Sequence, residues 1–143
     1  MKLKLAWIGK TKEAAIASLT AEYLKRLGRY VSTEGIELKS ETALREFAAK
    51  QRATLVLLDV RGKQMSSEEL AAFFRDHQQR GTQTLLFAIG PAGGFTDAAR
   101  RAAAVQLSLG KMTLPHELAR VVVAEQLYRA FTVLAGHPYH RGH

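Results

Sequence analysis

Cysteine is absent from the 143 residues of the chain. Its absence excludes disulfide bonds and thiolate metal sites, and it fits a reducing compartment. No apolar run approaches the roughly 20 residues of a membrane-spanning helix, and the first residues lack the apolar segment of a secretory signal. We therefore expect a soluble, cytoplasmic protein without a membrane partner.

Proline is also scarce. The three prolines, Pro91, Pro115 and Pro138, each lie at an expected boundary between elements, where the fixed φ angle of proline is tolerated. No internal repeat, low-complexity tract or linker interrupts the chain. A domain of this length buries roughly 70% of the surface of its unfolded chain. We expect a single domain over residues 1–143.

Acidic residues are outnumbered, with 13 Asp and Glu against 21 Lys and Arg, so that the formal net charge is +8. A basic protein with a merely solvated surface is one explanation. The basic residues are clustered, however, and clusters on one face bind phosphate with an affinity that falls steeply with salt. An RNA partner is therefore favoured. The clusters are Lys25, Arg26 and Arg29, then Arg61 and Lys63, then Arg100 and Arg101, and finally Arg141.

Strand-like and helix-like segments alternate along the chain. Residues 54–60 form a nearly unbroken apolar run, as expected for a strand covered on both faces. Alternation of this kind predicts an α/β fold, with a mainly parallel sheet and helices on both faces. The other expected strands are 2–8, 35–38, 82–89 and 105–109, and the expected helices are 12–29, 40–51, 66–79, 96–104 and the segment after His116.

Two local patterns support particular helices. In segment 12–29, Ala15, Leu19, Tyr23 and Leu27 recur every four residues, which predicts that they form the buried stripe of an amphipathic helix. Ser66 with Glu69 three residues later is the pattern of a capping box at a helix start.

A glycine-rich turn, Gly90 to Gly94, follows an apolar strand and precedes a helix, where α/β sheets bind ligands. The turn is neither a Walker P-loop nor a G-x-G-x-x-G dinucleotide fingerprint. A tight turn that uses glycine for positive φ is the alternative interpretation. The loop 107–116 is similar in kind: because its side chains are mostly small or apolar, it suits a ligand held by backbone groups.

The last long helix carries Glu125 and Arg129 four residues apart, in the favourable order for an ion pair, on a helix that is apolar around most of its circumference. Because burying unpaired charges is costly, the pair belongs either to a subunit interface or to an active site. The same all-round apolarity predicts packing on a second copy of the chain.

The tail combines aromatic, imidazole and guanidinium groups. Tyr139, His140 and Arg141 can stack on an exposed base and bind phosphate, although a frayed terminus is the alternative by position. His137, His140 and His143 are spaced three apart, but Arg141 intrudes and no carboxylate is close, so we expect no metal site. His116, at a helix start, is expected to be a positioning or capping residue.

Several segments together resemble a known family. LSLGKMTLPHELARVVVAEQLYRAF, HPYHR, MKLKLAWIGK, LLDVRGK and AIGPAGGF match, in order and spacing, the small SPOUT-class enzymes that methylate N3 of a pseudouridine in bacterial large-subunit ribosomal RNA. The resemblance implies a deep C-terminal trefoil knot, a homodimer, S-adenosylmethionine as methyl donor, and 23S ribosomal RNA as the substrate, met within the ribosome. Without the resemblance, topology rules would predict an unknotted doubly wound sheet, because threaded chains are rare.

The resemblance also implies site residues. The family often has Gly-Gly where this chain has Gly90 followed by Pro91, and the proline removes one N–H donor. Apolar side chains would contact the face of the adenine ring, and backbone groups would form hydrogen bonds with its edge. The implied cofactor-binding residues are Leu58, Gly90, Gly94, Leu109, Gly110, Lys111, Met112, Thr113, Leu114 and Pro115.

For catalysis, His140 is the expected general base because its ordinary pKa is near neutrality. Tyr139 would stack on or orient the RNA base that is methylated. Arg129 and Arg141 would stabilise the developing charge or bind phosphate. Glu125 would pair with Arg129. Two other hypotheses remain: a non-catalytic basic dimer that binds ribosomal RNA, and a different nucleotide-binding α/β enzyme.

Overall fold

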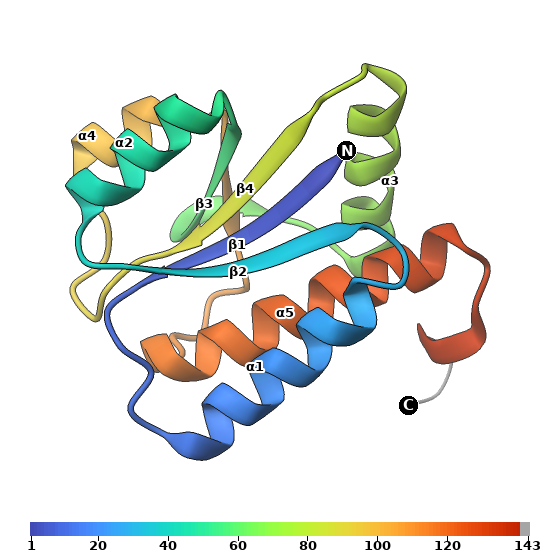
Figure 1. Cartoon of the computed structure of the whole chain (residues 1–143), viewed down its shortest axis with the longest axis horizontal. Helices are drawn as coiled ribbons and strands as arrows, with labels where there is room; N and C mark the ends of the chain where they lie inside the picture. The colour runs from blue at the N-terminus through green and yellow to red at the C-terminus, as the bar shows by residue number, and fades with distance from the viewer. Residues whose placement is uncertain (141–143) are drawn as a thin grey trace.

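Strands and helices alternate from the first residue to the last in the computed structural model, which describes residues 1–140 except for the side chain of His140 (Figure 1). The strands are β1 (Lys2–Ile8), β2 (Ser32–Leu38), β3 (Thr54–Gln64), β4 (Thr84–Ile89) and β5 (Val105–Ser108). The helices are α1 (Ala14–Leu27), α2 (Glu41–Gln51), α3 (Ser67–Gln79), α4 (Asp97–Ala102), α5 (His116–Leu134) and the 3-10 helix η1 (Pro138–His140).

The five strands form one sheet in the order β2-β1-β4-β3-β5, and neighbouring strands are parallel. The register aligns Leu5 with Gly35 on one side and with Phe87 on the other. The predicted α/β fold with a parallel sheet is therefore confirmed. All five strands point the same way, so the loops after β1, β3, β4 and β5 meet at one edge, which we call the carboxyl edge.

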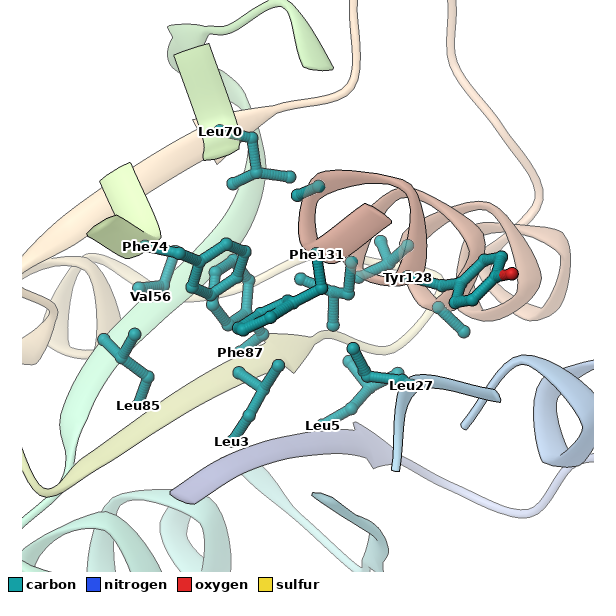
Figure 2. Close-up of a cluster of buried hydrophobic side chains, with 14 of the residues drawn as sticks. Leu3, Leu5, Leu27, Val56, Leu70, Phe74, Leu85, Phe87, Tyr128 and Phe131 are labelled. Carbon is teal, nitrogen blue, oxygen red and sulfur yellow. The ribbon is translucent and has the colours of Figure 1, made fainter. Parts of the chain in front are cut away.

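Alternate side chains of the three central strands, β1, β4 and β3, enter different cores. Leu3 and Leu5 of β1 belong to a cluster with residues of α1, α3 and α5, whereas Ala6 and Ile8 pack with residues of α2 and α4. Figure 2 shows Leu3, Leu5 and Phe87 of the sheet facing Phe131 of α5. Full burial of a side chain of this size contributes about 1.5–3 kcal/mol, so the two cores fix the helices on both faces.

Helix α5 is the long helix beside α1, and η1 turns back toward its end (Figure 1). As its all-round apolarity predicted, α5 is largely buried, and even Arg120 has no exposed surface. Within residues 1–140, no helix is both long enough and apolar enough to cross a membrane.

The stripe predicted for α1 is wrong in its first half and confirmed in its second. Ala15 is exposed and Leu19 is 47% exposed, whereas Tyr23 packs against the core and Leu27 is buried. Thr20, outside the predicted stripe, is buried as well. Each step of four residues advances about 40° beyond a full helical turn, so a line of four such residues winds away from one face. The buried face of α1 is fixed instead by its packing against α5 and β2.

Most predicted boundaries hold to within a few residues, and the capping box is confirmed. The Glu69 N–H donates to Ser66 Oγ (3.0 Å), and the Ser66 N–H donates to Glu69 Oε1 (2.9 Å). The largest differences are in the sheet: β2 begins at Ser32 rather than at residue 35, and β3 continues to Gln64 rather than ending at Val60.

Candidate functional site

A cavity of about 390 Å³ lies at the carboxyl edge of the sheet, between residues 58–61 of β3 and the loops that follow β4 and β5. Lys111 and Pro115, also predicted for cofactor binding, are not among its lining residues. The structure brings together on its wall Leu58, Gly90, Gly94, Leu109, Gly110, Met112, Thr113 and Leu114.

The glycine-rich turn forms one wall largely from backbone. The Gly94 N–H donates to the Pro91 carbonyl (2.8 Å), and Gly94 has a φ of +80°, which favours glycine. A Cβ at Gly90 would lie 3.1 Å from the Phe95 ring, so glycine lets that ring close over the end of β4. The turn is thus a tight turn with glycine at positive φ, as one interpretation of the sequence held. It also lines a cavity, as the ligand-binding interpretation requires.

Thr96, just after this turn, is held by a carboxylate of α2. Glu41 of α2 accepts hydrogen bonds from the Thr96 N–H (2.8 Å) and from the Thr96 hydroxyl. Burial raises the pKa of Glu41, but these hydrogen bonds lower it more, so that the net shift is downward. Thr96 is also the N-cap of α4, and the turn is therefore held by two helices.

A bulge in β3 supplies the opposite wall. Leu58 and Lys63 both pair with Leu107 of β5, so residues 59–62 leave the ladder between them. Gly62 allows this close crossing, because a Cβ there would lie 2.5 Å from the backbone carbon of Gln106. Bulges of this kind re-aim side chains next to sites, and here Asp59, Val60 and Arg61 line the cavity.

Asp59 is the centre of the charges in the cavity. Its Oδ2 accepts from Arg100 Nε (2.7 Å), its Oδ1 accepts from the Arg61 N–H (2.9 Å), and Arg100 also pairs with Asp97 (2.7 Å). Burial raises the pKa of Asp59, but these partners lower it below its usual value, so the carboxylate stays ionised. In the sequence, Arg61 and Arg100 were assigned only to basic clusters. Asp59, an acid at the end of the apolar run 54–60, was the signal that could have identified its network with these two arginines.

The loop after β5 closes the cavity. Gly110 has a φ of +132°, and its N–H and carbonyl both bond to the Ser108 hydroxyl (3.1 and 3.0 Å). Met112 is 79% exposed at the rim. The capping role considered for His116 is wrong: Pro115 is the N-cap residue and makes no side-chain cap, while His116 lines the cavity as the first residue of α5.

A second, smaller cavity of about 280 Å³ shares Leu58 and Leu109 with the first. It extends between α3 and α5 as far as Gln126, whose amide donates to Glu125 Oε1 (3.0 Å) and accepts from the Ser67 hydroxyl (2.7 Å). The cavity wall is therefore linked by side chains to the middle of α5.

Glu125, Arg129 and Tyr139 form a cluster on α5 and η1. Glu125 Oε2 accepts from Arg129 Nε (3.0 Å) and from the Tyr139 hydroxyl (3.0 Å), which confirms the predicted ion pair. The Arg129 guanidinium lies 5.3 Å from the centre of the Tyr139 ring, and that ring packs edge-on against Tyr128. Tyr139 is thus packed against α5 by its hydroxyl and by the two contacts described for its ring.

The pKa of Tyr139 is raised well above its usual value, first by burial and then by its hydrogen bond to the Glu125 carboxylate. The hydroxyl therefore keeps its proton at neutral pH. The backbone of His140 belongs to η1, whereas its side chain lies outside the described part of the structure, as do Arg141 and His143.

The tail cluster and the cavity lie at different places along α5. His116 starts the helix at the cavity, and Arg129 is 13 residues further on. At about 1.5 Å per residue, the two are roughly 20 Å apart along the axis. Arg129 and Tyr139 therefore lie well beyond the turn of α5 that lines the cavity of about 390 Å³.

Comparisons with known proteins identify the family. Residues 1–140 match the family model described as "Predicted SPOUT methyltransferase". The chain is 59% identical, over all of both chains, to Ribosomal RNA large subunit methyltransferase H of Koribacter versatilis, and 43% identical to the protein of that name from Geobacter sp., over 98% of this chain and 99% of that one.

Among solved structures, the fold is similar to the SpoU methyltransferase AviRb from Streptomyces viridochromogenes in complex with the cofactor AdoMet. The TM-score is 0.57 at 14% identity, with 94% of this chain covered. The match spans 58% of the AviRb chain, which is less than two thirds of that longer protein, and the likeness concerns the fold alone.

Proposed function

Because the chain belongs to the SPOUT methyltransferase family, we propose that it is an S-adenosylmethionine-dependent methyltransferase of large-subunit ribosomal RNA. Its target is N3 of a pseudouridine in 23S ribosomal RNA, reached in the cytoplasm on the assembled ribosome. The observation that carries the proposal is the cavity at the carboxyl edge, lined by the backbone of two glycine-bearing loops and by the bulge of β3.

The cavity has the size and lining that the methyl donor requires. Its volume of about 390 Å³ is within the usual range for small-molecule sites. Leu58, Leu109 and Leu114 offer apolar contact to the adenine ring, and the peptide group of Gly90 offers hydrogen bonds to its edge. Pro91 cannot donate, so the contacts of the turn fall on neighbouring N–H groups.

S-adenosylmethionine supplies an electrophilic methyl group when it is bound. The imide nitrogen of the target base attacks only after losing its proton, and a general base contributes about 10²–10⁴-fold to such a step. His140 takes that proton. Tyr139 does not accept the proton, because its raised pKa keeps its own hydroxyl protonated. It orients the target nucleobase instead. Arg129 and Arg141 stabilise the charge that develops on the flanking carbonyl groups.

The two halves of the site come from two copies of the chain. Because Arg129 and Tyr139 are remote from the cavity of their own chain, the end of α5 and η1 of one copy completes the cavity of the other. Large apolar side chains at the rim suit this contact, since Val60 is 64% and Met112 79% exposed. The site is thus absent from a monomer.

Mass mapping of ribosomal RNA tests the function. Ribosomes lacking the modification are incubated with the protein and isotopically labelled S-adenosylmethionine, and labelled methyl is expected on one pseudouridine at N3. Titration calorimetry with S-adenosylmethionine separates the alternatives. A protein that binds ribosomal RNA but not the methyl donor is the non-catalytic basic dimer, and one that binds another nucleotide instead is a different enzyme.

A further inference from the structure

The loop between β1 and α1, residues 9–13, is held at several points although it has no regular structure. We call it the lysine loop. Glu117 Oε1 accepts from the N–H groups of Lys12 (3.0 Å) and Glu13 (3.1 Å). At the start of the loop, the Gly9 N–H donates to the Leu38 carbonyl (2.9 Å). A surface loop fixed in this way presents its side chains in one place.

Arg120 strengthens this hold from inside the protein. Its guanidinium donates to the Thr11 hydroxyl (2.6 Å) and to the Ile8 carbonyl (3.1 Å), and the residue has no exposed surface. The guanidinium also lies 5.9 Å from the Trp7 ring. Glu117 and Arg120 are one turn apart on α5. A single stretch of that helix therefore forms hydrogen bonds with the end of the loop, through Glu117, and with its middle and the strand before it, through Arg120.

The same turn of α5 also lines the cavity. His116 and Ala119 face the cavity, whereas Glu117 and Arg120 hold the lysine loop. The loop and the cavity therefore lie on different sides of the same turn of α5. Because β1 is paired with β4, the loop also follows the strand next to β4, which ends at Ile89, directly before Gly90. The sequence alone grouped neither Lys10 nor Lys12 with a basic cluster.

Lys10 and Lys12 are the only parts of this well-held loop that carry positive charge, and both are exposed. Among residues 1–140, neither side chain forms a salt bridge. Arg61, which lines the cavity on the bulge of β3, is exposed as well. Exposed positive charge thus lies both at the cavity wall and on the loop that is held by the cavity-lining turn of α5.

We propose that Lys10 and Lys12 bind phosphate groups of the RNA strand next to the target nucleotide, on the chain whose cavity holds the methyl donor. The inference rests on the proposed function, since it identifies a surface that positions the same RNA. Phosphate contacts of this kind fix the position of a nucleic acid without reading its sequence. Glu117 and Arg120 act through the loop, as positioning residues.

A charge-neutralising variant tests the proposal. In Lys10→Gln/Lys12→Gln, we expect KM for ribosomes to rise about tenfold at physiological salt, while kcat changes little. The slope of log KM against log salt falls by about 1.4–1.8, from the loss of two phosphate contacts. Calorimetry should give the same affinity for S-adenosylmethionine as the unmodified chain. The matched control is Lys50→Gln/Arg75→Gln, which removes equal charge from exposed positions on α2 and α3.

Equal KM values and equal salt slopes in the two double variants would overturn the role of the lysine loop and leave the proposed function intact. If the unmodified chain transfers no methyl group, the proposed function fails, and binding of the same ribosomal RNA is then measured against salt. A slope reduced only by the lysine-loop variant would still support the phosphate contacts.

Discussion

The guanidinium of Arg120 donates a hydrogen bond of 3.1 Å to the carbonyl oxygen of Ile8, which joins the first turn of α5 to the end of β1. Arg120 is fully buried, and burial lowers the pKa of its guanidinium, while Glu117 and Glu37 raise it. Its Nε atom has no hydrogen-bond partner within residues 1–140. The guanidinium of Arg120 is therefore buried at a cost in solvation, and its hydrogen bonds hold the lysine loop.

Replacing Arg120 by Met keeps much of the apolar volume but removes the hydrogen bonds to Ile8 and Thr11. We expect the free energy of unfolding to fall by about 1–3 kcal/mol, because the carbonyl and hydroxyl groups lose a charged donor. Urea unfolding measures the change. The control is Arg75→Met on the exposed side of α3, which should change stability by less than about 0.5 kcal/mol. An Arg120→Met protein at least as stable as its parent would contradict this role.

The crossing of β3 over β5 at Gly62 gives a second prediction. In Gly62→Ala, the added Cβ would lie 2.5–2.7 Å from backbone atoms of Gln106 and Leu107, which cannot move as a flexible side chain does. We expect a loss of about 1–3 kcal/mol in the free energy of unfolding and weaker binding of S-adenosylmethionine, because the bulge forms a cavity wall.

Gly93→Ala is the matched control for this variant. A Cβ at Gly93 would meet nothing within 4 Å, and its φ is not in the left-handed region. Urea unfolding should therefore show little change in Gly93→Ala. Equal stability of the two alanine variants would show that β3 and β5 do not cross as closely as described.

His77 gives a pH dependence whose sign is fixed by geometry. Its Nε2 lies 3.2 Å from Arg80 Nη2, which can only donate, so the ring is neutral and Nδ1 donates to the Thr82 hydroxyl (2.8 Å). Burial, and then the charge of Arg80, lower the pKa of His77 below its ordinary value of 6.5. The unfolded chain therefore takes up a proton first as the pH falls.

The free energy of unfolding should consequently decrease as the pH is lowered from about 7.5 through the unfolded pKa of His77 toward its lower folded pKa. Denaturant unfolding at several pH values above 5.5 measures this, in a range where carboxylates are still ionised. The His77→Gln variant should lose part of the dependence. The same dependence in both proteins would show that His77 is not buried neutral.

Much of the fold could be predicted because its signals are local. Ser66 and Glu69 are three residues apart and form the capping box that their spacing indicates. The apolar run from Thr54 gives a strand whose partners lie on both sides. The face of α1 could not be predicted in this way, because α5 decides it, and α5 is far away in the sequence.

The parts of the site that each come from one short segment of the sequence could be predicted. Leu58, Gly90 and the loop after β5 come together because parallel strands end at one edge. Contacts between distant segments were not predictable: Asp59 meets Arg100 across 41 residues, and Arg120 meets Ile8 across 112. The trefoil knot implied by the resemblance stays a prediction.

Complementation between two inactive variants tests the shared site most directly. Thr113→Trp fills the cavity from its exposed rim, and His140→Ala removes the proposed base from the tail. Each protein alone should transfer almost no methyl group to ribosomes, with His140→Ala still binding S-adenosylmethionine. After equal amounts are unfolded and refolded together, half of the dimers are mixed and each has one intact site, so about a quarter of the parental activity should return. Mixed dimers that form and remain inactive would show that the cavity of one chain does not work with the tail of another.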